Sequence, residues 1–424
     1  MNLPPPAQRA ALLKERRLAF GLLLAAVTCL GMGQTVTFAI LPPIGRELGL
    51  SERQVGGIFS VSALLWVLFS PYWGRLSDRW GRKPIILIGM LGYIVSTTAF
   101  TGAIAYGLAG TASLGLVYLL MVVTRSIYGM IGPGVRVASQ AYIVDRTSLA
   151  DRTVAIAGLS AAFGFGNVIG PGLGAAFSVF GLLAPLWAIV VLVIIVGLAI
   201  VFALPENSEP DKQTASSRLP MNDKRVRPFL VYGLAVSFAV ATPMQASAFY
   251  FIDVLGFSAT DAAQYVGVGL SAAALAALFS QLFVVQKFRP SPATMMIAGA
   301  ALVGIAQLSI AASTTFAPMV FALMLNGFGA GLAMPGYSAG ASLAVGGHEQ
   351  GAVAGLTGAM GAAGFSIVPL INFSLYQVAP QLPFLFDAGL MALLLLYTWF
   401  TPKLRQANHA VGTMDPGSES GYSN

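Results

Sequence analysis

Charged residues are scarce in this chain, and their scarcity excludes most classes of soluble protein. Asp, Glu, Lys and Arg make up 9% of the 424 residues, against 56% hydrophobic residues, whereas a soluble domain carries about 25% charged residues. The chain has one cysteine, Cys29, in an apolar run, and two histidines, His348 and His409, in a loop and in the polar tail. These residues exclude an intrachain disulfide and a cysteine-based metal site. We predict no metal and no cofactor.

The chain also has no signature of catalysis or of nucleotide-driven work. It contains no Gly-Lys-Ser or Gly-Lys-Thr phosphate-binding sequence and no cluster with metal-ligand spacing. We therefore expect neither an enzyme nor an ATP-driven pump. The net charge of +7 in so apolar a chain is typical of lysines and arginines retained on the cytoplasmic side of a membrane, and it does not indicate a nucleic-acid partner.

Long apolar segments take up most of the chain. A membrane-spanning helix needs about 20 predominantly apolar residues. The predicted spans are 18–41, 54–73, 84–107, 114–138, 153–177, 183–204, 228–252, 262–286, 292–313, 317–343, 350–378 and 382–401. We therefore predict an all-α polytopic membrane protein with twelve transmembrane helices.

The basic residues predict the orientation of the chain. With the N-terminus inside, 19 of the 23 lysines and arginines lie on the cytoplasmic side, as the positive-inside rule requires. Arg46 and Arg53 fall in the first outer loop, and Arg125 and Arg136 fall inside span four. We predict that both termini are cytoplasmic.

One polar stretch divides the spans into two sets of six. The predicted parts are a cytoplasmic N-terminal segment 1–17, a six-helix bundle 18–204, a cytoplasmic linker 205–227, a second six-helix bundle 228–401 and a disordered cytoplasmic tail 402–424. Three features recur in the same order in both sets: Gly129 and Gly327, Gly166 with Pro171 and Gly364 with Pro369, and Leu48-Gly-Leu-Ser51 and Leu255-Gly-Phe-Ser258. Glycine-rich helices can match by chance, but three ordered matches favour two related halves.

Residues 74–84 read Gly-Arg-Leu-Ser-Asp-Arg-Trp-Gly-Arg-Lys-Pro and place a dense set of charges between two apolar spans. The two glycines permit a sharp reversal, and Asp78 can accept hydrogen bonds from backbone N–H groups or from the arginines around it. The pattern resembles the Gly-x-Leu-x-Asp-x-x-Gly-Arg-Lys signature between helices 2 and 3 of the major facilitator superfamily. This resemblance covers residues 18–401 and implies twelve helices in two pseudo-symmetric six-helix bundles.

The resemblance also implies a conformational latch. Asp145 is similar to the Asp that closes the fourth helix in this family and joins the cytoplasmic charge network around Asp78. Such a network would latch the outward-open state and break as the halves rock; a solvated cluster of loop charges is the alternative. The implied latch residues are Gly74, Asp78, Arg79, Gly81, Arg82 and Asp145.

Span five contains glycines four residues apart around a proline. Such glycines let a neighbouring backbone come close, and Pro171 removes a backbone N–H and kinks the helix. The segment resembles the Gly-Pro motif of the fifth helix in the drug:proton antiporter branch of the family, although Ala162 and Ala175 stand where glycines are usual. A packing helix without a hinge role is the alternative. The predicted hinge residues are Gly166, Gly170, Pro171 and Gly174.

Span four carries two arginines that share a helix face. Arg125 and Arg136 are eleven residues apart, which is about three turns and about 16 Å along the axis. An arginine inside a membrane is costly unless it meets a partner or water. Arg125 resembles the fourth-helix arginine of the antiporters, and Tyr128 replaces the glutamine of that motif. Arg125 either has a role in the cavity or in coupling, or it makes a structural hydrogen bond to backbone carbonyls. Arg136 either contacts the substrate or extends its charged end to the cytoplasmic membrane surface.

Polar residues inside the spans are further cavity candidates, although each alone also fits a helix–helix hydrogen bond. The predicted substrate-binding residues are Gln34, Arg125, Tyr128, Arg136, Gln245, Asn326 and Asn372.

Acidic residues are absent from spans one to six. Gln34 stands where the family often has an acid in its first helix, whereas Asp253 ends span seven and Asp387 starts span twelve. Proton coupling therefore uses Asp253 or Asp387, with Arg125 as a third coupling candidate, or protons are not the coupling ion. An interface acid exposed to water is the alternative for Asp387.

The resemblance implies a secondary transporter of the inner membrane. It would move a small organic, amphiphilic molecule by rocker-switch alternating access, in exchange for protons and in the direction of export, as in multidrug resistance. The alternative is a carrier or exchanger of organic anions that uses Arg125 and Arg136 without proton coupling. A non-transporting receptor on the same scaffold is a third class. The expected partners are a small-molecule substrate, protons and membrane lipid, without nucleic acid, and we expect a monomer.

Overall fold

The computed structural model describes residues 6–147, 149–205, 219–346 and 349–405, and within them no residue is in a strand. The first part of the chain forms α1 (Pro6–Leu48), α2 (Glu52–Trp80), α3 (Arg82–Leu108), α4 (Leu114–Ile131), α5 (Pro133–Asp145), α6 (Leu149–Ser178) and α7 (Ala184–Ala203). The second part forms α8 (Arg227–Asp253), α9 (Ala259–Phe279), the π-helix η1 (Ser280–Val285), α10 (Gln286–Phe288), α11 (Pro292–Ala312), α12 (Phe316–Leu343), α13 (Gln350–Tyr376), α14 (Leu382–Phe400) and α15 (Pro402–Arg405). The prediction of an all-α fold is confirmed.

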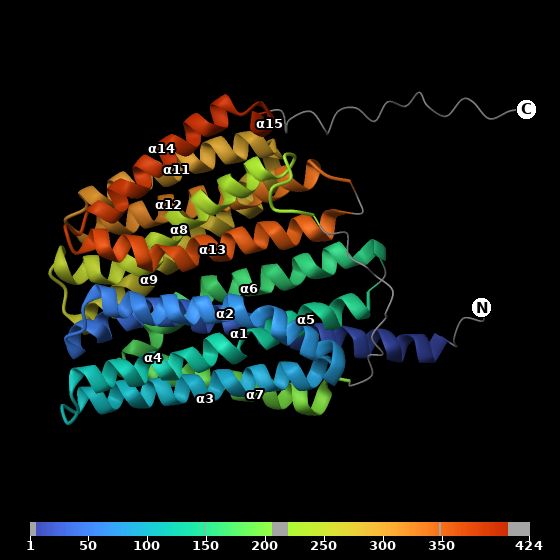
Figure 1. Ribbon diagram of the computed structural model, residues 1–424, viewed down its shortest axis with the longest axis horizontal. Coiled ribbons are helices and arrows are strands. Elements are labelled where there is room, and N and C mark those ends of the chain that lie inside the picture. Colours follow the sequence, from blue (N-terminus) through green and yellow to red (C-terminus); the bar gives the residue numbers. More distant parts are fainter. Residues whose placement is uncertain (1–5, 148, 206–218, 347–348, 406–424) are drawn as a thin grey trace, which may run out of the picture.

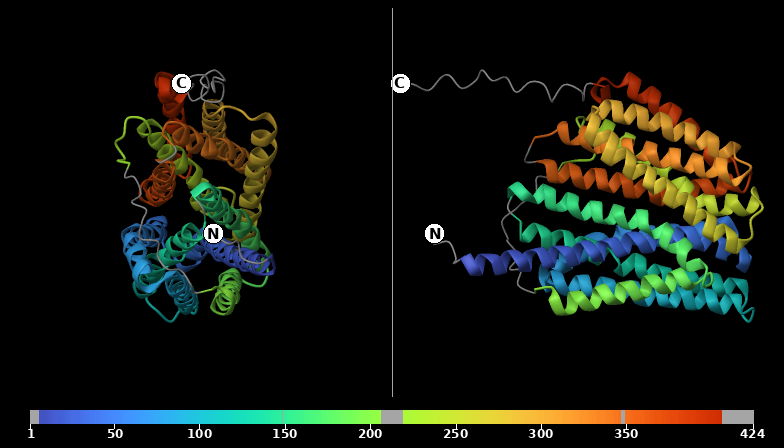
Figure 2. Two further views of the ribbon diagram at one scale, coloured as in Figure 1. Left: turned by 90° about the vertical axis from the view of Figure 1, so that its right-hand side faces the viewer. Right: turned by 180° about the vertical axis from the view of Figure 1, so that it is seen from behind.

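The long helices lie side by side in two groups that follow the chain order (Figure 1). Helices α1–α7, coloured blue to green, form the first half, and helices α8–α14 form the second half above it. Helix α1 begins and α14 ends at the same end of the bundle, which we call the terminal end (Figures 1 and 2). The opposite end is called the far end below.

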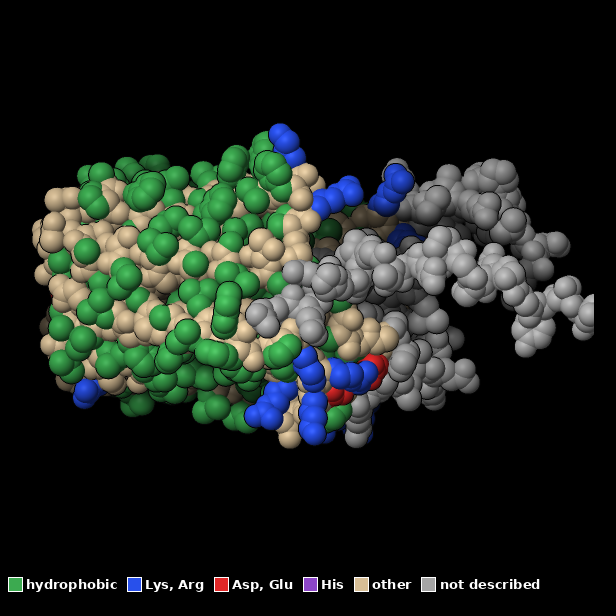
Figure 3. Space-filling model, turned by 90° about the horizontal axis from the view of Figure 1, so that it is seen from above, with side chains coloured by type: hydrophobic (Ala, Val, Ile, Leu, Met, Phe, Trp, Pro, Cys, Tyr) green, Lys and Arg blue, Asp and Glu red, His purple; other side chains and the backbone are tan. Residues whose placement is uncertain are grey.

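The bundle has the dimensions and surface of a membrane protein. Eleven candidate spans among the described residues are long and apolar enough to cross a bilayer. Helix α6 has 30 residues, or about 45 Å of length, and lies among them (Figure 1). Figure 3 shows apolar side chains over the flank of the bundle, with most of the visible lysines and arginines gathered toward the terminal end. This arrangement fits a bilayer around the flank.

Several helix boundaries differ from the predicted spans. Helix α1 begins at Pro6, inside the segment predicted to precede the first span. The regular hydrogen-bond pattern of span four breaks at Gly132, because Pro133 cannot donate a backbone hydrogen bond and is the first residue of α5. Gly132 itself keeps helical angles (φ −55°, ψ −35°), so Leu114–Asp145 still forms one span. Span eight ends in the π-helix η1. Most of the predicted linker, 206–218, and most of the predicted tail, 406–424, lie outside the described residues. The first residues of that tail were predicted to be disordered, but they form the short helix α15.

The repeated tetrapeptides form the same turn in both halves. Gly49 and Gly256 have positive φ angles of 80° and 74°, a conformation that glycine adopts without steric cost. Two residues later, the hydroxyl of Ser51 caps α2 and that of Ser258 caps α9 by accepting from a backbone N–H. The sequence match therefore corresponds to one repeated structure.

The repeated glycines also occupy equivalent packing positions. A Cβ on Gly129 of α4 would overlap the backbone of α2, and one on Gly327 of α12 would overlap the backbone of α9. In the same way, Gly166 of α6 fits against α1, and Gly364 of α13 fits against α8. These two helix pairs of the first half thus have counterparts in the second, as expected of two related bundles.

Candidate functional site

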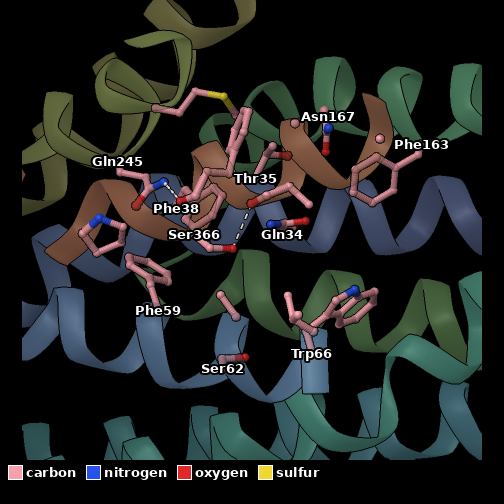
Figure 4. A pocket seen from close by; sticks show the side chains of 18 of the residues that line it. Gln34, Thr35, Phe38, Phe59, Ser62, Trp66, Phe163, Asn167, Gln245 and Ser366 are labelled. Carbon is pink, nitrogen blue, oxygen red and sulfur yellow. Dashed lines mark hydrogen bonds between the residues drawn. The ribbon is translucent and has the colours of Figure 1, made fainter. Parts of the chain in front are cut away.

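A cavity of about 350 Å³ lies between the two halves. Its walls come from α1, α2, α4, α5 and α6 of the first half and from α8, α12 and α13 of the second. Figure 4 shows Gln34, Trp66 and Asn167 among the side chains that line it. A volume of this size suits a small organic molecule, and a wall made by both halves changes shape whenever the halves move.

Five of the seven predicted substrate-binding residues line this cavity, namely Gln34, Arg125, Tyr128, Arg136 and Gln245. The other two lie elsewhere in the second half. Asn326 accepts a hydrogen bond from Gln307 at 3.5 Å, and Asn372 donates one to Thr242 at 2.5 Å. Both of these contacts join helices to each other, which is the alternative that the sequence left open.

Arg125 is held by aromatic rings. Its side chain is only 3% exposed, and its guanidinium carbon lies 4.6 Å from the ring centre of Tyr128 and 5.9 Å from that of Phe100. Atoms Nε and Nη1 have no hydrogen-bond partner. Cation–π contacts offset part of the cost of burying the charge, and these two buried nitrogen atoms are left without a protein acceptor.

Arg136 reaches the same cavity from the far side of the helix break. It belongs to α5, and its guanidinium carbon lies 4.9 Å from the ring centre of Phe163 on α6. Both arginines line the cavity, as a shared helix face predicts, because Gly132 between them keeps helical angles. Its contact with Phe163 and its place in the cavity wall put the Arg136 side chain inside the bundle rather than at the membrane surface.

The cavity is cationic and aromatic. Arg125 and Arg136 line it, and no Asp or Glu is among the described residues of its wall. Tyr128 was predicted, but six further aromatic residues of the wall were not, because apolar residues on a membrane helix give no signal of which face meets a cavity. They are Phe38, Phe59, Trp66, Phe163, Tyr337 and Phe365.

The two coupling acids occupy different environments. Asp387 lies in α14 and is fully buried, so it is not exposed to water. Thr242 and Asn372 lie beside its carboxyl group, but neither carboxyl oxygen has a hydrogen-bond partner. Asp253 ends α8 at the far end, where Arg46 lies 2.6 Å from it. Neither acid lines the cavity.

The residues of the predicted latch meet around Arg82. This side chain donates to Asp78 at 2.5 Å and to Asp145 at 2.8 Å, and thereby joins α2, α3 and α5. Gly81 turns between α2 and α3 with a φ of 93°, which only glycine adopts easily. Gly74 lies near Val137 of α5, and Arg79 is exposed.

All partners of Arg82 belong to the first half, so these ion pairs do not join the two halves. In the second half, Arg225 plays a comparable part by bonding Asp223 and Glu349. The hydrogen bonds from Arg225 hold the pKa of Asp223 below its ordinary value. Each network ties loops within one half at the terminal end.

The predicted hinge residues place α6 against α1. A Cβ on Gly166 or Gly170 would overlap the backbone of α1, whereas Gly174 leaves ordinary space. The carbonyl of Pro171 faces Gly267 of α9. Helix α6 continues through Pro171 without interruption, so the glycines serve close packing within the first half and against the second.

Two helical bundles with a cavity lined by both define a multi-pass membrane transporter. A family model described as Major Facilitator Superfamily matches residues 23–369. The chain belongs to this family, whose members are transporters and not enzymes. The predictions of family and of a non-enzymatic protein are confirmed.

Resistance proteins of bacteria are among its relatives. Multidrug resistance protein 2 of Bacillus subtilis (strain 168) is 27% identical over 195 residues, and the match spans 46% of this chain and 46% of that protein. The class B tetracycline resistance protein of Escherichia coli is 27% identical over 367 residues, which cover 82% of this chain and 85% of the relative. The crystal structure of the human organic anion transporter MFSD10 (TETRAN) superposes with a TM-score of 0.64 at 20% identity, covering 93% of this chain and 100% of that one.

Proposed function

We propose that the protein exports a small amphiphilic organic molecule across the inner membrane by alternating access. The observation that carries this proposal is the cavity between the halves, which combines aromatic walls with polar groups from both halves. The names of the multidrug and tetracycline resistance relatives support export, as does the motif of α6. In this proposal the terminal end is cytoplasmic, and the protein acts as a monomer surrounded by lipid.

Proton exchange drives the export, with Asp387 as the group that takes up and releases the proton. Its support is a fully buried carboxyl group without a hydrogen-bond partner, beside Thr242 and Asn372. A buried acid inside a membrane bundle marks a proton path more often than a structural site. Because Asp387 does not line the cavity, its protonation would act on the substrate through movement of the second half.

Proteoliposomes that carry a pH-sensitive dye test this coupling. Adding substrate from a panel of cationic, neutral and anionic amphiphiles should move protons with the wild type and not with Asp387→Asn. The matched control is Asp261→Asn, which neutralises an exposed acid in the first turn of α9 and should leave the signal intact. Substrate transport without proton movement in the wild type would contradict the coupling.

The charge of the cavity favours a second, narrower candidate, a carrier of organic anions. Two arginines and no described acid line the wall, and two donors of Arg125 have no protein partner. A carboxylate, sulfonate or phosphate on the substrate would pair with these guanidinium groups by charge-assisted hydrogen bonds. Aromatic rings on several sides of the cavity suit an attached planar body.

Matched anionic and cationic analogues of one aromatic compound separate the two candidates. Binding can be followed by tryptophan fluorescence, because Trp66 lines the cavity. For an anion carrier, Arg125→Gln and Arg136→Gln should each lower the affinity for the anionic analogue about tenfold, or about 1.4 kcal/mol. The affinity for the cationic analogue should change little. Arg227→Gln, which changes an exposed arginine at the start of α8, is the control. Equal effects on both analogues would exclude the anion carrier.

A further inference from the structure

A cluster of charged and polar side chains joins the two halves at the far end of the bundle. The first half contributes Arg46, from the last turn of α1, and Glu52, from the first turn of α2. The second half contributes Asp253, from the end of α8, together with Tyr376 and Gln377 at the end of α13. We infer that this cluster is the outer gate of the transporter and that Arg46 is the residue that holds it shut.

Each carboxylate of the cluster is bonded by both halves. Asp253 of the second half lies 2.6 Å from Nη2 of Arg46 and accepts from the hydroxyl of Tyr376 at 3.0 Å. Glu52 of the first half also pairs with Arg46 and accepts from Gln377 at 3.3 Å. Each carboxylate therefore has one partner from each half. The guanidinium carbon of Arg46 also lies 5.1 Å from the ring centre of Phe249 on α8.

This cluster differs from the other ion pairs of the described residues. Arg82 pairs within the first half, and so does Arg146. Arg225 pairs within the second half. Among the described ion pairs, Arg46 with Asp253 is the one that crosses between the halves. When the far ends separate, this pair must break together with the hydrogen bond from Gln377 to Glu52.

Close packing at two glycines joins the halves next to the same end. Gly56 of α2 fits against Phe373 and Pro369 of α13, and Gly267 of α9 fits against Ala175 of α6. These apolar contacts are not directional, so they do not fix how the two ends meet. The hydrogen bonds of an arginine between two carboxylates are directional and do fix it. Side chains of Arg46 and Asp253 are 28% and 25% exposed, so water can replace their bonds as they separate. A partly exposed pair of this kind is strong enough to bias the two states and weak enough to open.

Distances between spin labels test the gate without any substrate. In a Cys29→Ser background, labels at Thr111→Cys in the first half and Thr260→Cys in the second report the separation of the far ends, since both positions are exposed there. Arg46→Gln and Asp253→Asn should each raise the ratio of long to short distances about fivefold, the size expected of one such pair. The reversed pair, Arg46→Asp with Asp253→Arg, should return the ratio toward that of the wild type.

Arg225→Gln removes an arginine whose partners lie within one half, and it should leave the distances unchanged. An unchanged distribution in both single variants would overturn the gate. So would a reversed pair that stays as open as the single variants while eluting as a folded protein. The inference rests on the proposed alternating access, but not on the exported molecule or on protons. A failed transport assay with shifted distances would therefore refute the proposed substrate or coupling and leave the gate standing.

Discussion

Tyr128 illustrates how one residue sets the chemistry of the site. Its ring lies beneath Arg125 and also packs against Trp66 and Tyr93, at centre distances of 5.2 and 5.1 Å. The sequence predicted an arginine in the interior, because a charge there is costly without a role. It did not predict aromatic partners, since the phenol replaces the amide of the familiar motif. The buried Asp387 was likewise predicted as a candidate, but its separation from the cavity follows from the packing of α14 and not from any local pattern.

Replacing Tyr128 tests whether the ring or the hydroxyl matters. Tyr128→Phe keeps the aromatic face and should bind substrate as the wild type does. Tyr128→Leu removes it, and because a cation–π contact contributes about 0.5–2 kcal/mol, we expect affinity to fall by roughly three- to thirtyfold. Tryptophan fluorescence titration measures both variants. A phenylalanine variant as weak as the leucine variant would show that the hydroxyl is the active group.

Hydropathy predicts the elements well, since the thickness of the bilayer fixes how long each apolar run must be. Their ends are less predictable, because α1 continues beyond the apolar run to Pro6, where composition gives no boundary. The division at Gly132 was missed because the apolar residues continue across it. Repeated glycines were the better guide to packing: Gly129 and Gly327 were matched by sequence, and they occupy equivalent contacts.

Glycine substitutions along α6 test this packing. Gly170→Ala places a methyl group against the backbone of α1 and the hydroxyl of Thr35, whereas Gly164→Ala meets no atom within 4 Å. We expect Gly170→Ala to lower the melting temperature by several degrees, since overpacking costs about 1–3 kcal/mol. Gly164→Ala should leave it unchanged. Thermal unfolding in detergent compares the two variants. Equal melting temperatures would mean that α6 shifts to accommodate the methyl group without loss of stability.

At the scale of the whole molecule, the two halves meet at the far end and enclose a shared cavity. The cavity takes residues from eight helices spread between Gln34 and Pro369. No continuous stretch of sequence contains this site. Its arginines could be predicted because a charge inside an apolar span stands out, whereas most of its aromatic and apolar lining residues could not. The ion-pair networks also differ between the two ends of the bundle. Those around Arg82 and Arg225 at the terminal end hold each half together, and the one around Arg46 at the far end holds the halves to each other.

A disulfide between the halves tests the account most directly. A Cβ on Gly172 of α6 would lie 3.1 Å from Oγ of Ser271 on α9, a spacing that a disulfide can bridge. In a Cys29→Ser background, Gly172→Cys with Ser271→Cys should therefore crosslink on oxidation. We predict that oxidation stops transport in proteoliposomes, that a reductant restores it, and that each single cysteine variant is unaffected. Undiminished transport by the fully crosslinked protein would contradict alternating access between these two halves.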